Sequence, residues 1–85
     1  LVTLVQLDLS ANKMLQVGSD ISKLQYVREL NLSKNLLTEL PYEFGNLEHL
    51  TKLNLRSNML EDMPKSIARL KNLEVLDLSL NKLKG

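Results

Sequence analysis

Leucines recur along this chain in pairs two residues apart, and the pairs return every 23 residues. Leu30 and Leu32 form one such pair, in the stretch LNLSKNLLTELPYEFGNL, with polar residues between and around them. Because alternate side chains of a β-strand point to opposite faces, each pair predicts a short strand with its leucines on one side. We expect four parallel strands in register, centred on Gln6 to Ser10, Glu29 to Ser33, Lys52 to Arg56 and Val75 to Ser79.

The same period of 23 residues governs the rest of the chain. It divides the sequence into units 1–23, 24–46, 47–69 and a shorter fourth unit, 70–85. Seven columns of the aligned units are apolar, and one consists of asparagine. A unit of this size cannot bury its apolar face alone, so the repeat predicts stacked units that share one aliphatic core.

The asparagine column marks the point where each predicted strand ends and the chain turns inward. A side-chain amide can both donate to and accept from backbone groups that a turn inside a stack leaves unpaired. We therefore interpret the four asparagines as a structural ladder: Asn12, Asn35, Asn58 and Asn81.

The second half of each unit returns the chain to the next strand. Two units carry Leu40-Pro41 and Met63-Pro64 in this segment. Proline fixes φ and cannot continue a regular helix, so we expect short helical turns or irregular structure. In the first unit Val17-Gly18 replaces this pair, and the pattern leaves its return segment open.

These columns resemble the leucine-rich repeat family, whose consensus is L-x-x-L-x-L-x-x-N-x-L. The period and the leucine-proline segments look like those of the intracellular, Ras-suppressor-like type. The resemblance implies an α/β solenoid with a curved parallel sheet on its concave face and short helical or irregular segments on its convex side. The copies of the consensus run from Leu4 to Met14, Val27 to Leu37, Leu50 to Leu60 and Leu73 to Leu83.

The resemblance also implies binding on the concave face, so the outward-facing strand residues are candidate contacts. Arg56 stands in a column where the other repeats have serine, and arginine is enriched at binding hot spots. Leu36 and Met59 are neighbouring apolar residues among polar ones, which indicates a contact surface. The predicted partner-binding residues are Arg56, Met59, Leu36, Asn54, Asn31, Lys52, Glu29 and Asp77.

Some of these features have simpler explanations. Leu36 and Met59 could pack partly against the return loop. Glu29 and Lys52 could form a surface ion pair, which would stabilise the fold by about 0–1 kcal/mol. Asn31-Leu32-Ser33 matches the glycosylation motif N-x-[ST], with Asn31 and Ser33 both expected to face outward, although such short matches often arise by chance.

Composition and charge narrow the class of protein. With 11 basic and 10 acidic residues the net charge is +1, which gives no electrostatic footprint for nucleic acid. No apolar run approaches the roughly 18 residues that span a bilayer. The chain has no cysteine, so it has no disulfide framework or thiolate metal site, and a reducing compartment such as the cytoplasm is favoured.

Groups for an enzyme active site are sparse. His49 is the single histidine and falls in a column at the rim of the solenoid, where we expect it to be solvated. Without a second histidine beside it, a metal pair is not expected. The carboxylates of Glu61 and Asp62 fall in a predicted loop. We therefore expect no enzymatic activity, no metal site and no cofactor.

The function that these observations favour is a protein–protein interaction scaffold that binds a folded protein partner. The alternative is an accessory domain of a larger enzyme, because leucine-rich repeats also accompany mRNA deadenylases and adenylate cyclases. A receptor ectodomain is disfavoured by the missing cysteines. Neither end shows a polar capping repeat, so the sequence predicts a domain fragment, residues 1–85, of a longer chain.

Overall fold

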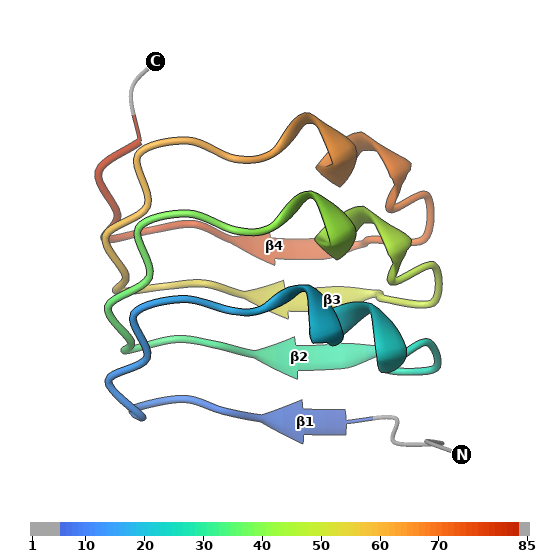
Figure 1. Cartoon of the computed structure of the whole chain (residues 1–85), viewed down its shortest axis with the longest axis horizontal. Helices are drawn as coiled ribbons and strands as arrows, with labels where there is room; N and C mark the ends of the chain where they lie inside the picture. Colours follow the sequence, from blue (N-terminus) through green and yellow to red (C-terminus); the bar gives the residue numbers. More distant parts are fainter. Residues whose placement is uncertain (1–5, 84–85) are drawn as a thin grey trace.

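The computed structural model describes residues 6–83 and shows four short parallel strands stacked in chain order (Figure 1). Each strand residue pairs with the residue 23 positions further on, as Leu7 with Leu30 and Leu30 with Leu53. The predicted parallel sheet in register is confirmed. The strands are β1 (Gln6–Asp8), β2 (Glu29–Asn31), β3 (Lys52–Asn54) and β4 (Val75–Asp77).

The regular strands are shorter than predicted, although hydrogen bonding between the repeats continues beyond them. Leu9 and Ala11 donate their N–H groups to the carbonyls of Asn31 and Ser33, at 2.8 and 3.0 Å. At Ala11 and at the equivalent position of each later repeat, the chain then enters the left-handed region, with φ between 56° and 61°. This conformation turns the chain out of the sheet and ends each strand.

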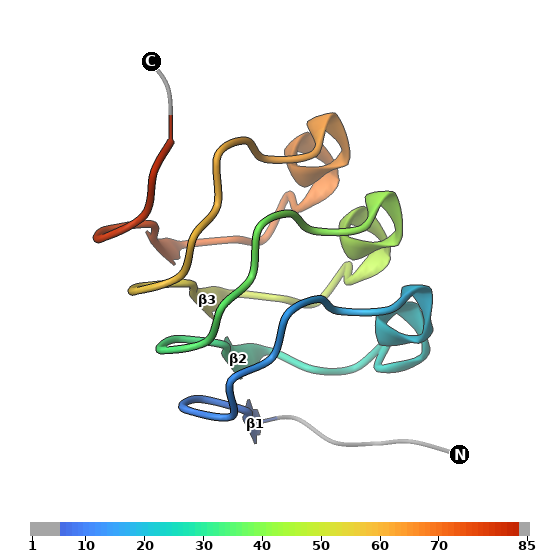
Figure 2. The same cartoon turned by 60° about the vertical axis from the view of Figure 1, so that its left-hand side comes forward.

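The return segments form short 3-10 helices on the side opposite the sheet (Figure 2). An extended residue precedes each of them, with φ of −71° at Pro41, −65° at Pro64 and −77° at Gly18. Gly18 thus takes the φ that proline would fix, and the return segment left open by the sequence forms the same turn as the others. The helices are η1 (Ser19–Lys23), η2 (Tyr42–Asn46) and η3 (Lys65–Arg69).

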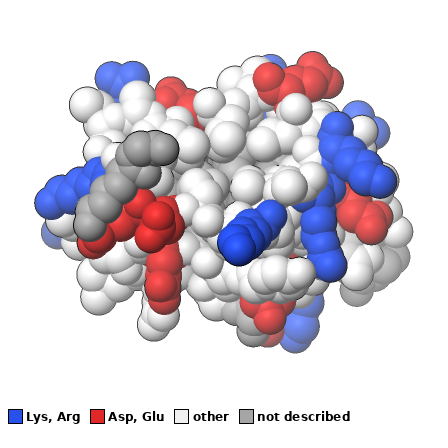
Figure 3. Space-filling model, turned by 90° about the horizontal axis from the view of Figure 1, so that it is seen from above, with Lys and Arg blue, Asp and Glu red and all other residues white. Residues whose placement is uncertain are grey.

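An aliphatic core fills the space between the sheet and the 3-10 helices. Phe44, the largest fully buried side chain, enters it from η2. Leu30 is 2% exposed, whereas Leu76 in the same column of the fourth repeat is 40% exposed. Seen from above, much of the surface belongs to residues other than Lys, Arg, Asp and Glu, with charged side chains of both signs among them (Figure 3). Burial of a leucine therefore depends on having a repeat stacked on each side.

Candidate functional site

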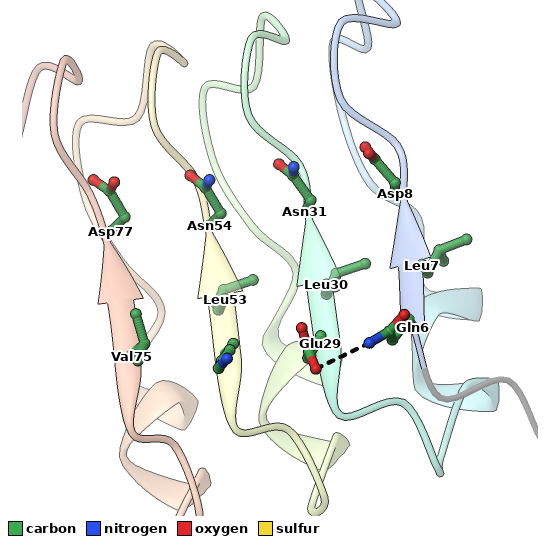
Figure 4. A pocket seen from close by; sticks show the side chains of 11 residues that line it. Gln6, Leu7, Asp8, Glu29, Leu30, Asn31, Leu53, Asn54, Val75 and Asp77 are labelled. Atoms are coloured by element: carbon green, nitrogen blue, oxygen red, sulfur yellow. Dashed lines mark hydrogen bonds between the residues drawn. The ribbon is translucent and has the colours of Figure 1, made fainter.

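A groove of about 580 Å³ crosses all four strands on the face opposite the core (Figure 4). Its side walls come from the residues on either side of the central leucine of each strand, because these side chains alternate away from the core. We call this surface the concave face; Arg56, Leu36 and Met59, which the sequence predicts on it, are not among the residues that line the groove. The polar residues that line the groove are Gln6, Asp8, Glu29, Asn31, Lys52, Asn54 and Asp77.

Four of these side chains form a row across the groove: Asp8, Asn31, Asn54 and Asp77 (Figure 4). In each, one side-chain oxygen accepts the backbone N–H two residues further on, at 2.9 to 3.0 Å. In the first, second and fourth repeats a serine hydroxyl donates to the same oxygen at 2.6 to 2.7 Å. These turns hold each side chain in place and leave its other terminal atom for contacts outside the turn.

The serine hydroxyls also act on the charge of the row. The hydrogen bond from Ser10 is the largest cause of a lowered pKa at Asp8, and that from Ser79 is the largest cause of a lowered pKa at Asp77. The backbone N–H of the same serine adds to each effect, while partial loss of hydration opposes it. Both ends of the row are therefore anionic at neutral pH.

The role of the hydroxyl can be tested directly. We expect Ser10→Ala to raise the pKa of Asp8 toward its ordinary value, because the hydroxyl donates to the ionised carboxylate and stabilises it. An NMR titration of the side-chain carboxyl carbons would measure this, with Asp77 as the internal control. If the pKa of Asp8 stays where it was in the Ser10→Ala chain, the hydroxyl is not the main cause.

Two cations lie on either side of Asn54: Lys52 in β3, and Arg56 just beyond it. Arg56 Nη1 donates to Ser79 Oγ at 3.4 Å. Glu29 stands opposite Lys52 in the sheet register, but its Oε2 accepts a hydrogen bond from Gln6 Nε2 at 3.1 Å. The hydrogen bond that the structure shows for Glu29 is thus to Gln6 and not to Lys52.

The predicted apolar pair consists of Leu36 and Met59. Leu36 is 41% exposed and Met59 is 37% exposed. The N–H of Leu36 donates to the carbonyl of Met14, and that of Met59 to the carbonyl of Leu37, both at 2.8 Å. The backbone of each residue is therefore tied to the preceding repeat, while its side chain is partly covered and partly open to solvent.

The glycosylation motif departs from its predicted orientation. Ser33 is buried, and its hydroxyl turns back to donate to Asn31 Oδ1 at 2.7 Å. The prediction that both Asn31 and Ser33 face outward is therefore wrong for Ser33, and Asn31 is only half-exposed.

The asparagine column lies away from the groove, at the turns. Asn35 is 3% exposed, and its Oδ1 accepts the N–H groups of Asn12 and Met14 at 3.0 Å each. Its Nδ2 donates to the carbonyls of Leu9 and Leu32 at 3.0 and 2.9 Å. One side chain thus bonds its own repeat to the preceding one.

Asn58 repeats this arrangement one unit further on. It is 5% exposed, accepts the N–H of Leu37, and donates to the carbonyls of Leu32 and Leu55. Asn81 bonds in the same way while half-buried, and Asn12 is exposed.

Outside the groove, the histidine is the next described residue of chemical interest. His49 is exposed and stacks on Tyr26 with 5.6 Å between ring centroids, beside a hollow of about 400 Å³ at the rim. Within residues 6–83 no three histidine, cysteine or acidic side chains come together as a metal site. No helix in that part of the chain has the length and apolar character to cross a membrane.

Residue-level reasoning from the sequence found only part of the groove. Five lining residues belong to the predicted set: Glu29, Asn31, Lys52, Asn54 and Asp77. Gln6 and Asp8 also line the groove and were not in that set. Their positions in the same columns as Glu29 and Asn31 are the signal that identifies them.

Comparison with known proteins bears on both fold and family. Residues 2–60 match a family model described as "Leucine rich repeat". Among solved structures, the leucine-rich repeat protein LIC12759 of Leptospira interrogans matches 94% of this chain with 44% identity and a TM-score of 0.93. The chain spans 20% of the length of that protein. None of the curated proteins compared with the chain matches it.

Proposed function

The chain belongs to the leucine-rich repeat family, and on that basis we propose that it is a protein-interaction module whose concave face binds a folded protein partner. The observation that carries the proposal is the open groove across all four strands, whose polar row is already held by hydrogen bonds. Side chains fixed before binding lose little conformational entropy when a partner arrives.

The proposed contact region centres on the third repeat. Arg56, Asn54 and Met59 come from that repeat, and Leu36 is the second-repeat neighbour of Met59. In this proposal the partner covers the exposed apolar pair and also contacts the polar groove. Protein interfaces share this combination of an apolar centre and a polar rim. The remaining proposed contacts are Asn31, Lys52, Glu29 and Asp77.

Further details of the proposal concern the type of repeat. Leu40-Pro41, Met63-Pro64 and the 23-residue register support the intracellular, Ras-suppressor-like type, and the absence of cysteine supports a cytoplasmic location. The module itself has no catalytic role in this proposal, and its concave face would serve equally as the accessory domain of a larger enzyme.

Alanine substitutions on the concave face should weaken partner binding without unfolding the protein. We expect Arg56→Ala and Met59→Ala each to weaken binding by about 1–2 kcal/mol, because central anchors dominate the energy of an interface. Both residues are exposed, so their melting temperatures should stay close to that of the parent chain. Calorimetry with the partner, and thermal melts in parallel, would measure the two effects.

The convex side offers matched controls. Tyr42, at the start of η2, is exposed under the guanidinium of Arg69, and Lys65, at the start of η3, is exposed as well. Tyr42→Ala and Lys65→Ala should leave affinity unchanged. Loss of binding in these two variants, with none in Arg56→Ala and Met59→Ala, would show that the partner uses the convex side or an edge.

A further inference from the structure

The turns at the strand ends determine which atom of each side chain in the polar row meets a ligand. The backbone N–H groups of Ser33 and Arg56 can only donate, so the atoms that they contact on Asn31 and Asn54 are the amide oxygens. The amide nitrogens are then left for the groove. At Asp8 and Asp77 the same turn occupies one carboxylate oxygen and leaves the other.

The row therefore has a fixed order of hydrogen-bonding character across the sheet. From Asp8 through Asn31 and Asn54 to Asp77 it presents an acceptor, two donors and an acceptor, and the register places these residues side by side (Figure 4). The two donors together form a place for an oxygen, and the two anionic ends form places for cations.

The charges near the row favour the same arrangement, with an anion at the middle and cations at the ends. Lys52 and Arg56, two residues before and after Asn54, add positive charge on either side of it. Glu29 offsets part of the charge of Lys52, and Arg56 offsets part of that of Asp77. Asp8 is thus the less compensated of the two terminal carboxylates, and the middle of the row is where an anion is favoured.

The spacing of the row matches an extended peptide. Adjacent strands lie about 4.8 Å apart, so the three steps from Asp8 to Asp77 span about 14 Å, and the point between the two asparagines lies about 7 Å from either end. In an extended chain, residues two apart point to the same side and lie about 6.6 to 7 Å apart. Residues i, i+2 and i+4 of such a segment can therefore meet the two ends and the middle of the row together.

We propose that the concave face binds an extended segment of its protein partner in which an acidic side chain lies between two basic ones, in the order basic-x-acidic-x-basic. The segment runs along the stack, across the strands. Its carboxylate accepts hydrogen bonds from Asn31 and Asn54, and its two basic side chains meet Asp8 and Asp77. This inference rests on the proposed function, because it names the chemistry of the segment that the concave face takes.

Two labelled peptides of identical composition test this order. The first carries Arg-Thr-Glu-Thr-Arg at its centre, and the second carries Arg-Thr-Arg-Thr-Glu, so both have the same net charge. Fluorescence anisotropy with the whole chain, at low ionic strength, should show the first peptide binding about tenfold more tightly, because all three of its charges face complementary groups, whereas two of the three charges of the second peptide do not.

A nearly isosteric substitution links that preference to the row. Asn54→Asp keeps the oxygen that accepts the Arg56 N–H and replaces the donor in the groove by an acceptor. It should remove most of the tenfold preference. Asn46→Asp is the matched control, since it makes the same charge change at an exposed position of η2, away from the groove, and should leave the preference intact.

Each result separates this inference from the proposed function. Equal affinity of the two peptides, no measurable binding of either, or an unchanged preference in Asn54→Asp would overturn the basic-x-acidic-x-basic order. If Arg56→Ala still weakens binding of the protein partner, the proposed function survives that failure. Should Tyr42→Ala rather than Arg56→Ala abolish partner binding, the proposed function fails as well.

Discussion

Asn35→Ala and Asn58→Ala are each expected to lower the free energy of unfolding by about 1–3 kcal/mol more than Asn31→Ala and Asn54→Ala. All four substitutions remove the same amide group. The difference comes from burial, because Asn35 is 3% and Asn58 is 5% exposed, whereas Asn31 and Asn54 line an open groove. A backbone group left unpaired inside the stack cannot form a replacement hydrogen bond with water.

The geometry around Asn35 shows what would be lost. Its amide serves the N–H groups of Asn12 and Met14 and the carbonyls of Leu9 and Leu32, which belong to two repeats. Within residues 6–83 every buried side-chain nitrogen or oxygen has a hydrogen-bond partner, so the substitution would break a satisfied network.

The structure also predicts an order within the second pair. Asn31 Oδ1 accepts from both the N–H and the hydroxyl of Ser33, while among the described residues Asn54 Oδ1 accepts from the N–H of Arg56 alone. Asn31→Ala should therefore cost more than Asn54→Ala, and less than Asn35→Ala. Urea denaturation of the four variants would measure these differences. Equal losses at all four positions would contradict the structural role of the buried asparagines.

The register of the sheet could be predicted from the sequence because every repeat has the same length. The leucine columns require a parallel sheet with a 23-residue offset. A slip of one residue would move the leucines of a strand from the core face to the exposed face. The ends of the strands were harder to predict. The chain turns away three residues after the strands, where Ala11, Lys34 and Ser57 take positive φ, and none of these residue types signals that conformation in the way glycine does.

The sequence predicted which columns of residues face the groove, but not how the atoms of those side chains are bonded. Aspartate and asparagine in one column and serine in another were visible in the sequence, but the bond between them was not. That bond turns the Ser33 hydroxyl back onto Asn31 and orients the Asn31 amide. The equivalent bond from Ser10 lowers the pKa of Asp8. Such effects depend on the backbone turn that places the two side chains together, which no spacing rule in the sequence specified.

Gly45→Ala is expected to destabilise the protein by about 1–3 kcal/mol, as overpacking of a filled space does. Gly45 is buried in η2, directly against η3 of the next repeat. A Cβ atom at this position would lie 2.5 Å from the carbonyl oxygen of Ser66 and 2.7 Å from its Cβ. The backbone of Gly45 is not in the left-handed region, so the clash alone produces the loss.

The close approach of η2 and η3 has an identifiable cause. Ser66 is buried, and its hydroxyl donates to the carbonyl of Tyr42 at 2.7 Å, which ties the two 3-10 helices together. The nearest obstacle to a new Cβ is a backbone oxygen, and it can move only if the helix moves with it. The first and third repeats have Ser22 and Ala68 at the position of Gly45, so glycine is a requirement of this one contact and not of the turn.

Gly18→Ala provides the control, because no described heavy atom lies within 4 Å of the corresponding Cβ position. With φ of −77°, alanine fits the native backbone and reduces the freedom of the unfolded chain. A gain of about 0.4–1 kcal/mol is therefore expected. Thermal melts of the two variants should move in opposite directions from the parent chain. If Gly45→Ala melts with or above the parent, η2 and η3 are not packed as tightly as their contact at Ser66 requires.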